Sequence, residues 1–137
     1  MKRFFYLVAL VVFALILVAC GSDEADFPEE GGDTVVVETE YDDHGWKGKL
    51  AVTFDGNLIS EAEYDEFDRQ GNSKADDEDY ASRMVPVSGI SPAEAFDELE
   101  ASLVDAQDPE AMDAVTGATQ SSDWFIDLAE RAVEEHS

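Results

Sequence analysis

The apolar and polar positions of the chain fall into three successive patterns. An unbroken apolar run from Phe4 to Ala19 follows Lys2 and Arg3 at the start of the chain. A polar, acidic stretch over residues 20–33 comes next, and after it apolar residues recur at regular spacings. The apolar run is shorter than the roughly 20 residues that a membrane-spanning helix needs. A basic start before a short apolar run is typical of a signal peptide, which we expect over residues 1–19.

The regularly patterned region begins with segments that predict strands. Thr34–Tyr41 is rich in valine and threonine, and Lys49–Phe54 alternates apolar and polar residues with the period of a strand. A third strand is predicted over Leu58–Tyr64. The Asp55-Gly56-Asn57 sequence favours a hairpin turn there, because glycine readily adopts the positive φ that such a turn requires. Asp68–Asp79 is polar and irregular, and we expect a loop.

Two helices are predicted after the strands. Ser91 is placed to cap the first, Pro92 follows at a position where its missing N–H costs little, and Glu94 completes a capping box. We expect this helix to end at Asp108-Pro109, and a second helix to run from about Ser122 to Glu134. The first helix carries its apolar residues on one face, at Phe96, Leu99 and Leu103. The predicted class is α+β, a small antiparallel sheet of hairpins followed by two helices that pack on it.

Charge and length narrow the classes of function. The 137 residues include 33 acidic and 8 basic ones, and two of the basic residues lie inside the predicted signal peptide. So acidic a chain repels nucleic acids and anionic lipid surfaces, because those partners need basic patches. The length after the signal peptide suits one domain, which we place at residues 34–137. Residues 20–33 are expected to form an acidic, flexible tether before it.

The sequence around Cys20 predicts a lipid anchor. Leu17-Val18-Ala19-Cys20, followed by Gly21, resembles the lipobox of bacterial lipoproteins. The resemblance implies cleavage before Cys20 and a diacylglycerol on its sulfur, with palmitate-type acyl chains. Cys20 is the only cysteine, so no intramolecular disulfide competes for the thiol. We therefore expect a protein held by lipid on the extracytoplasmic face of the bacterial cell membrane.

The segment between the two predicted helices carries the candidate chemistry. It consists of small and hydroxyl-bearing residues over Asp113–Ser122, with Gly117 and Ala118 at its centre. Glycine lets the backbone approach a ligand closely, and free N–H groups at the start of a helix favour a phosphate. The hydroxyls of Thr119, Ser121 and Ser122 lie at the same place. The residues alone leave two interpretations open, a phosphate site with a hydroxyl beside it or an ordinary capped helix start.

The Asp-x-x-Thr-Gly-Ala-Thr sequence over 113–119 resembles the flavinylation motif of the FMN-binding domain family. This family includes a subunit of the sodium-pumping NADH:quinone oxidoreductase and many bacterial surface lipoproteins. The resemblance implies that a flavin transferase takes FMN from FAD and joins its phosphate covalently to Thr119. It also implies that the transferase needs Asp113, and that Thr116, Gly117 and Ala118 complete the recognised loop. Further segments resemble the lipoproteins of this family in order and spacing, namely Tyr41–Lys49, 55–57, 88–90 and 107–109.

Two tryptophans are candidates to stack on the flavin ring. Trp46 lies at a bend flanked by glycine, and Trp124 lies five residues after Thr119. The alternative for both is packing in the core. The sequence contains no paired-cysteine or EF-hand pattern that would predict a metal site.

The leading hypothesis is an electron-transfer protein rather than a stand-alone enzyme. Covalent FMN would pass electrons from a membrane dehydrogenase to an external acceptor, and no residue need act as a catalytic acid or base. A second hypothesis is the redox subunit of a reductase that acts on a small external acceptor. A third, from another class, is a non-redox acidic surface lipoprotein that binds cations or a protein partner.

Overall fold

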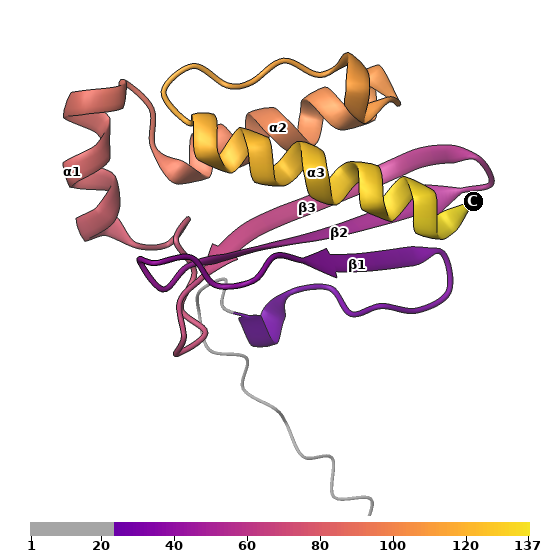
Figure 1. The fold of residues 1–137 in the computed structure, drawn as a ribbon, viewed down its shortest axis with the longest axis horizontal. Coiled ribbons are helices and arrows are strands. Elements are labelled where there is room, and N and C mark those ends of the chain that lie inside the picture. Colours follow the sequence, from indigo (N-terminus) through magenta and orange to yellow (C-terminus); the bar gives the residue numbers. More distant parts are fainter. Residues whose placement is uncertain (1–23) are drawn as a thin grey trace, which may run out of the picture.

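Three antiparallel strands and three α-helices build the described part of the chain (Figure 1). The computed structural model describes residues 24–137; the predicted signal peptide and Cys20 lie outside these residues. The strands lie in the order β1-β2-β3, and each hydrogen-bonds to its neighbour in the sequence. The elements are the 3-10 helix η1 (Glu24–Asp26), β1 (Thr34–Glu38), β2 (Lys47–Asp55), β3 (Leu58–Phe67), α1 (Glu78–Ser88), α2 (Pro92–Ala106), the 3-10 helix η2 (Pro109–Ala111) and α3 (Thr119–His136).

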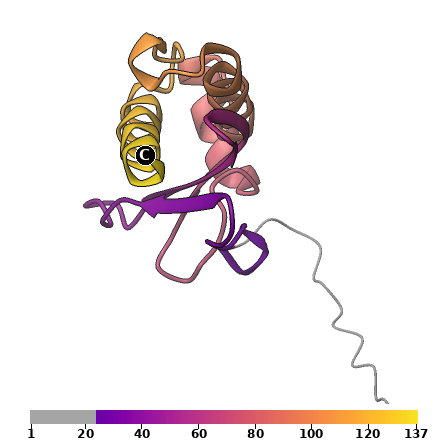
Figure 2. The ribbon, with the colours of Figure 1, turned by 90° about the vertical axis from the view of Figure 1, so that its right-hand side faces the viewer.

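The helices α2 and α3 cover one face of the sheet (Figure 2). Alternate residues of β2, among them Leu50 and Val52, are fully buried on this face. The predicted apolar stripe of α2 meets them, and Phe125 and Leu128 complete the core from α3. The predicted α+β class, an antiparallel sheet followed by helices, is confirmed.

The hairpin between β2 and β3 forms where the sequence predicts it. Asp55 pairs with Leu58, which leaves Gly56 and Asn57 as a two-residue turn, and Gly56 has φ 62°. The register shifts between Thr53 and Phe54, an irregularity that bends the strand just before the turn.

The capping box of α2 forms as predicted. The Ser91 hydroxyl accepts a hydrogen bond from the Glu94 N–H at 3.3 Å, and the Glu94 carboxylate accepts one from the Ser91 N–H at 3.1 Å. The helix ends at Ala106, slightly before the predicted stop, because Gln107 takes up a left-handed conformation with φ 61°. The Gln107 side chain then bonds to both backbone groups of Ile59, at 2.8 Å each, and ties α2 to β3.

Helix α1 was not among the two helices that the sequence predicts. Asp77 caps it by accepting from the Tyr80 N–H at 2.9 Å, but none of its residues is buried. Its apolar stripe is short and only half-buried, at Tyr80, Ala81 and Met84, and the helix contains Pro86. Helix α3 matches the second predicted helix but begins earlier, at Thr119 instead of Ser122.

The other face of the sheet carries a smaller apolar cluster, built around the segment that precedes β1. Phe27 packs there on Ala51 and edge-on against Phe67, with ring centroids 5.7 Å apart. Glu24 forms an ion pair with Lys47 at 2.9 Å. Part of the stretch that we expected to act as a tether thus packs on the domain from Glu24 onward. No helix in the described part of the chain is long and apolar enough to cross a membrane.

Candidate functional site

The predicted motif forms a tight turn at the start of α3, on the side of the domain where α1 lies (Figure 1). The Ala118 N–H donates to the Val115 carbonyl at 3.0 Å and closes the turn. Gly117 has φ 87°, a left-handed conformation that suits the third position of a type II turn. A Cβ at Gly117 would also lie 2.5 Å from the Ser88 carbonyl oxygen of α1. Glycine is therefore required here both by conformation and by contact.

Ser122, in the first turn of α3, holds the tight turn of the motif in place by hydrogen bonds. Its side chain is fully buried, and its hydroxyl donates to the Ala118 carbonyl at 2.7 Å and accepts from the Val115 N–H at 2.9 Å. We had placed Ser122 among the candidate cofactor ligands. Contact of Ser122 with a cofactor stays a prediction, but its one O–H is already donated inside the chain and its side chain is buried, which favours the role of holding the turn.

The N-terminus of α3 is left open, with Thr119 exposed as its first residue. Ala118 occupies the cap position and no side chain caps the helix. The first turn of α3 contains no acidic residue, whereas the first turns of α1 and α2 both do. The first N–H groups of α3 thus have no side-chain cap and no acidic residue within their own turn, an arrangement that favours an anion.

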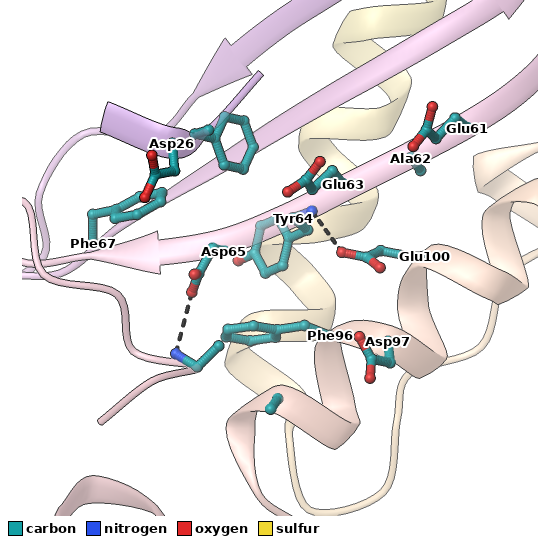
Figure 3. Close-up of a pocket in the computed structure, with 13 residues that line it drawn as sticks. Asp26, Glu61, Ala62, Glu63, Tyr64, Asp65, Phe67, Phe96, Asp97 and Glu100 are labelled. Carbon is teal, nitrogen blue, oxygen red and sulfur yellow. Dashed lines mark hydrogen bonds between the residues drawn. The ribbon is translucent and has the colours of Figure 1, made fainter. Parts of the chain in front are cut away.

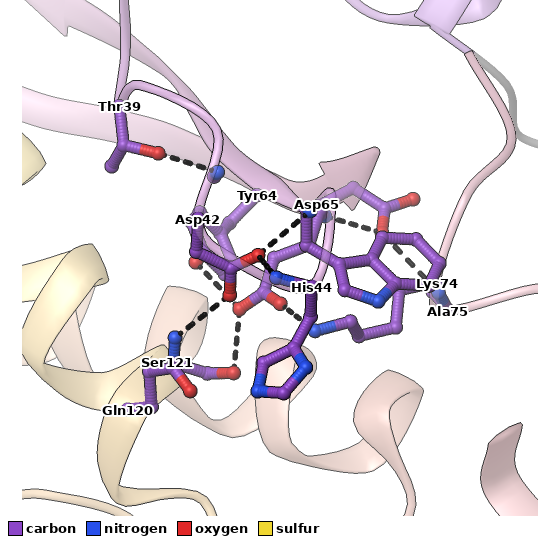
Figure 4. A network of polar contacts seen from close by, with 12 residues as sticks. Thr39, Asp42, His44, Tyr64, Asp65, Lys74, Ala75, Gln120 and Ser121 are labelled. Atoms are coloured by element: carbon purple, nitrogen blue, oxygen red, sulfur yellow. Dashed lines mark hydrogen bonds and ion pairs between the residues drawn. The ribbon is translucent and has the colours of Figure 1, made fainter. Parts of the chain in front are cut away.

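A buried polar network lies directly behind this open end (Figure 4). The Ser121 hydroxyl donates to Glu66 Oε1 at 2.5 Å, and the Tyr64 hydroxyl donates to the same oxygen at 2.9 Å. The other oxygen of Glu66 pairs with the buried Lys74 ammonium. Burial, followed by the nearby Glu66 charge, raises the pKa of Tyr64 well above its usual value. Ser121, predicted as a cofactor ligand, therefore ties the first turn of α3 to the sheet.

The loop that carries Trp46 adjoins the same helix end. Asp42 holds this loop by accepting from the Trp46 N–H at 2.9 Å, and Gln120 of α3 donates to its other oxygen at 3.1 Å. Burial alone would raise the pKa of Asp42, but these hydrogen bonds outweigh it and lower that pKa. The Lys74 ammonium lies 4.6 Å from the centre of the Trp46 ring. The structure thus brings Trp46 and the α3 N-terminus together.

Trp124 packs against β2, on the sheet side of α3. A Cβ at Gly48 would lie 3.2 Å from Trp124 Cε3 and 2.8 Å from the Tyr64 hydroxyl, so this glycine leaves room for both rings. Trp46 and Trp124 are both half-buried. Contact of either ring with a flavin stays a prediction, and for Trp124 the observed contacts favour the packing role.

Asp113 and Thr116 lie on the outer side of the motif, where both are exposed. They line a cavity of about 290 Å³ between the loop and α2, together with Glu98 and Ser102. The carboxylate that the resemblance assigns to transferase recognition is thus accessible from solvent.

A separate cavity of about 340 Å³ lies beside β3 and α2 and contains none of the motif residues (Figure 3). Its polar lining is acidic, with Asp26, Glu61, Glu63, Asp65, Asp97 and Glu100. Burial raises the pKa of Asp65 to about 6, although the Ser73 hydroxyl partly offsets this effect. A negatively charged phosphate would be repelled here. Nowhere in residues 24–137 do three or more histidine, cysteine, aspartate or glutamate side chains gather so as to hold a metal ion.

The Glu100 carboxyl should make the stability of the domain depend on pH. Burial raises its pKa from 4.5 to about 7, with the charges of Asp97, Glu63 and Asp65 adding to the rise and the bond from the Tyr64 N–H opposing it. A raised pKa means that ionisation destabilises the folded state, so stability increases as the pH falls through about 7 toward 4.5. Between pH 8 and pH 5, we expect the free energy of unfolding to rise by about 2 kcal/mol less in Glu100→Gln than in the wild-type domain.

Urea unfolding at several pH values measures how steeply the free energy of unfolding depends on pH, and this slope should be smaller in Glu100→Gln. Glu98→Gln is the matched control, because Glu98 lies on the same helix and is exposed. Equal slopes for the two variants would show that Glu100 is ionised at no cost in the folded domain.

Comparisons with known proteins assign the chain to a family. The family described as "FMN-binding domain" matches residues 44–134. The 15 kDa lipoprotein of Treponema pallidum is 44% identical over 86 residues, which cover 63% of this chain and 61% of that protein, less than two thirds of its length. The crystal structure of the CPE2226 protein from Clostridium perfringens has a TM-score of 0.73 and 41% identity, and the match covers 75% of this chain and 85% of that one. The family match spans most of the described domain and the whole motif, and the chain therefore belongs to the FMN-binding domain family.

Proposed function

We propose that this chain is a lipid-anchored, extracytoplasmic electron carrier whose FMN is attached through its phosphate to Thr119. The observation that carries the proposal is the open N-terminus of α3. In a chain with 33 acidic residues, this helix alone among the three α-helices described has no acid in its first turn and no side-chain cap. An exposed threonine hydroxyl stands at that place. A phosphoester on Thr119 would bring its charge to the positive end of the helix.

The attachment step needs only the threonine, FAD and a flavin transferase. The Thr119 Oγ–H bond and the diphosphate bond of FAD break, the new Oγ–P bond joins FMN to the protein, and AMP leaves with the proton. Within the chain, the Val115–Ala118 turn presents Thr119, and Ser122 and Gly117 fix that turn. Asp113, exposed on the outer side of the loop, is the group we assign to contact with the transferase.

Two considerations support a carrier over an enzyme. FMN supplies the redox chemistry when it is bound, and the protein orients it and exposes it to partners. The ionisable side chains that lie buried or half-buried behind the motif are already paired, since Glu66 and Lys74 bond to each other and Asp42 holds its own loop. The chain thus offers no free buried acid or base beside Thr119 in its described part, as a proton-transfer enzyme would require.

The lipid anchor is proposed from two observations. The sequence before and after Cys20 has the lipobox pattern, and the relative from Treponema pallidum is described as a lipoprotein. A covalent cofactor suits this location, because outside the cell a dissociable flavin would be lost by dilution. The electron donor in this proposal is a membrane dehydrogenase, and the acceptor lies outside the membrane.

Intact mass of the denatured protein tests the proposal. The mature chain is produced with and without a flavin transferase, denatured, freed of small molecules, and examined by mass spectrometry and flavin fluorescence. We expect a gain of one FMN less one water only when the transferase is present. A chain that stays unmodified while the transferase labels a control substrate would overturn covalent attachment and favour an acidic binding module. Turnover of a small acceptor by the loaded chain would instead favour the reductase hypothesis.

A further inference from the structure

Exposed apolar side chains are few on this domain, and they gather mainly at one place. Among residues 24–137, the large hydrophobic side chains that are exposed are Leu58, Val85 and Val87. Val85 is 42% exposed and Val87 is 89% exposed, and Pro86 between them is exposed as well. Consecutive residues of a helix point about 100° apart, so these three wrap around the outward side of the end of α1. We call Val85, Pro86 and Val87 the α1 tip.

The α1 tip adjoins the loop that presents Thr119. Ser88 follows the tip directly, and its backbone is so close to Gly117 that a Cβ there would lie 2.5 Å from the Ser88 oxygen. The Ser88 hydroxyl lies 2.9 Å from the carbonyl oxygens of both Met84 and Ile90, which fixes the end of the helix. The third exposed hydrophobic residue, Leu58, lies in the β2–β3 hairpin at the opposite end of the sheet (Figure 1).

Exposed acids outnumber exposed bases on the segments that meet near the α1 tip. Arg83 lies two residues before the tip and Glu78 and Asp79 lie at the start of α1, whereas Asp113 lies on the adjoining loop and Asp123 on α3. The whole chain carries a formal net charge of −25. A second copy of this chain or an anionic membrane would therefore be repelled from the tip, whereas a cationic partner would be attracted.

A small apolar contact inside a charged rim is suited to brief encounters between proteins. Electron-transfer pairs are weak and bury less than about 1,200 Å² in total, and their charged rims accelerate association more than they strengthen it. We propose that the α1 tip is the docking surface for a cationic one-electron carrier protein. The proposal rests on the proposed function, to which it adds the acceptor. In such an encounter the oxidised centre of the partner gains the one electron that the reduced cofactor loses.

Binding can be measured without any flavin, so this proposal can fail independently of covalent attachment. The mature chain, produced without flavin transferase, is titrated with a basic c-type cytochrome at low ionic strength by calorimetry or NMR. We expect Val85→Ser/Val87→Ser to raise the Kd about tenfold, equivalent to about 1.4 kcal/mol. Leu58→Ser is the matched control and should leave the Kd unchanged. Added salt should weaken binding, and an acidic cytochrome should not bind.

Three results would overturn the proposal. The first is an unchanged Kd for the tip variant, and the second is chemical-shift changes in the wild-type chain that gather away from α1. The third is a flavin-loaded chain that no longer binds, because the cofactor itself would then cover the tip. Since α1 buries none of its residues, the double substitution should leave the fold intact. If the double variant fails to fold, the chemical-shift mapping on the wild-type chain still decides where the partner binds.

Discussion

Thr119→Ala should abolish covalent flavin completely while leaving the fold unchanged. The substitution removes the hydroxyl group, whose oxygen would form the bond to phosphorus, and without that oxygen no phosphoester can form. Thr119 is exposed and makes no capping bond, so we expect the free energy of unfolding to change by less than about 0.5 kcal/mol. Intact mass and fluorescence of the denatured protein, after production with a flavin transferase, measure the loss.

Two further variants control for effects on the loop instead of the linkage. Thr119→Ser keeps a hydroxyl at the same place and should restore flavin. Thr116→Ala removes the other exposed threonine of the motif and should leave the linkage itself intact on every loaded molecule, whatever the yield. Flavin that survives denaturation of Thr119→Ala would locate the attachment at a different residue.

Lys74→Met should destabilise the domain by about 3–5 kcal/mol, because it leaves the Glu66 carboxylate buried without its cation. Glu66 is 1% exposed and Lys74 is 7% exposed, so water cannot replace the lost partner. The Lys74 ammonium also lies 4.9 Å from the centre of the Tyr80 ring, and methionine would lose that attraction. A loss of this size is a large part of the 5–15 kcal/mol that stabilises a typical domain. Urea unfolding monitored by tryptophan fluorescence measures it.

The double variant Lys74→Met/Glu66→Gln separates the unpaired charge from the loss of packing. It should recover most of the stability, because the glutamine oxygen can still accept from Ser121 and Tyr64. Arg131→Met is the control for an exposed ion pair, the one with Asp127 at 3.9 Å, and should cost less than about 1 kcal/mol. If Lys74→Met and Arg131→Met unfold at the same urea concentration, Glu66 gains little from its buried partner.

The strands and the two long helices could be predicted because their signals are local. The alternation around Leu50 and Val52, the Gly56 turn and the capping box at Ser91 each depend on a few neighbouring residues. Helix α1 gives a weaker signal, since it fully buries no side chain and contains Pro86, although Asp77 caps its start and Gly89 its end. The packing of Phe27 on Phe67 joins residues forty positions apart, which local patterns do not reveal.

For the site, the motif could be predicted but its support could not. The resemblance over 113–119 singled out Thr119, and the structure places that residue exposed at an open helix end. No local pattern indicates that Glu66 and Lys74 pair behind it, because their side chains come from β3 and from the loop after it. Ser122 is a candidate ligand by its hydroxyl and its place after the motif. Its burial is not visible in the sequence, because it depends on how α3 packs on the turn.

The packing of Phe27 beneath the sheet also determines how the domain would stand on a bilayer. With a lipid on Cys20, only three residues lie between the anchored cysteine and Glu24, where the packed chain begins. Those few peptide units reach at most about 15 Å. The face of the sheet that carries Phe27 would then lie next to the lipid head groups, and the helices would point toward the aqueous phase (Figure 2). Thr119 and the end of α1 would then be presented to diffusing proteins close to the membrane, without a long swinging arm.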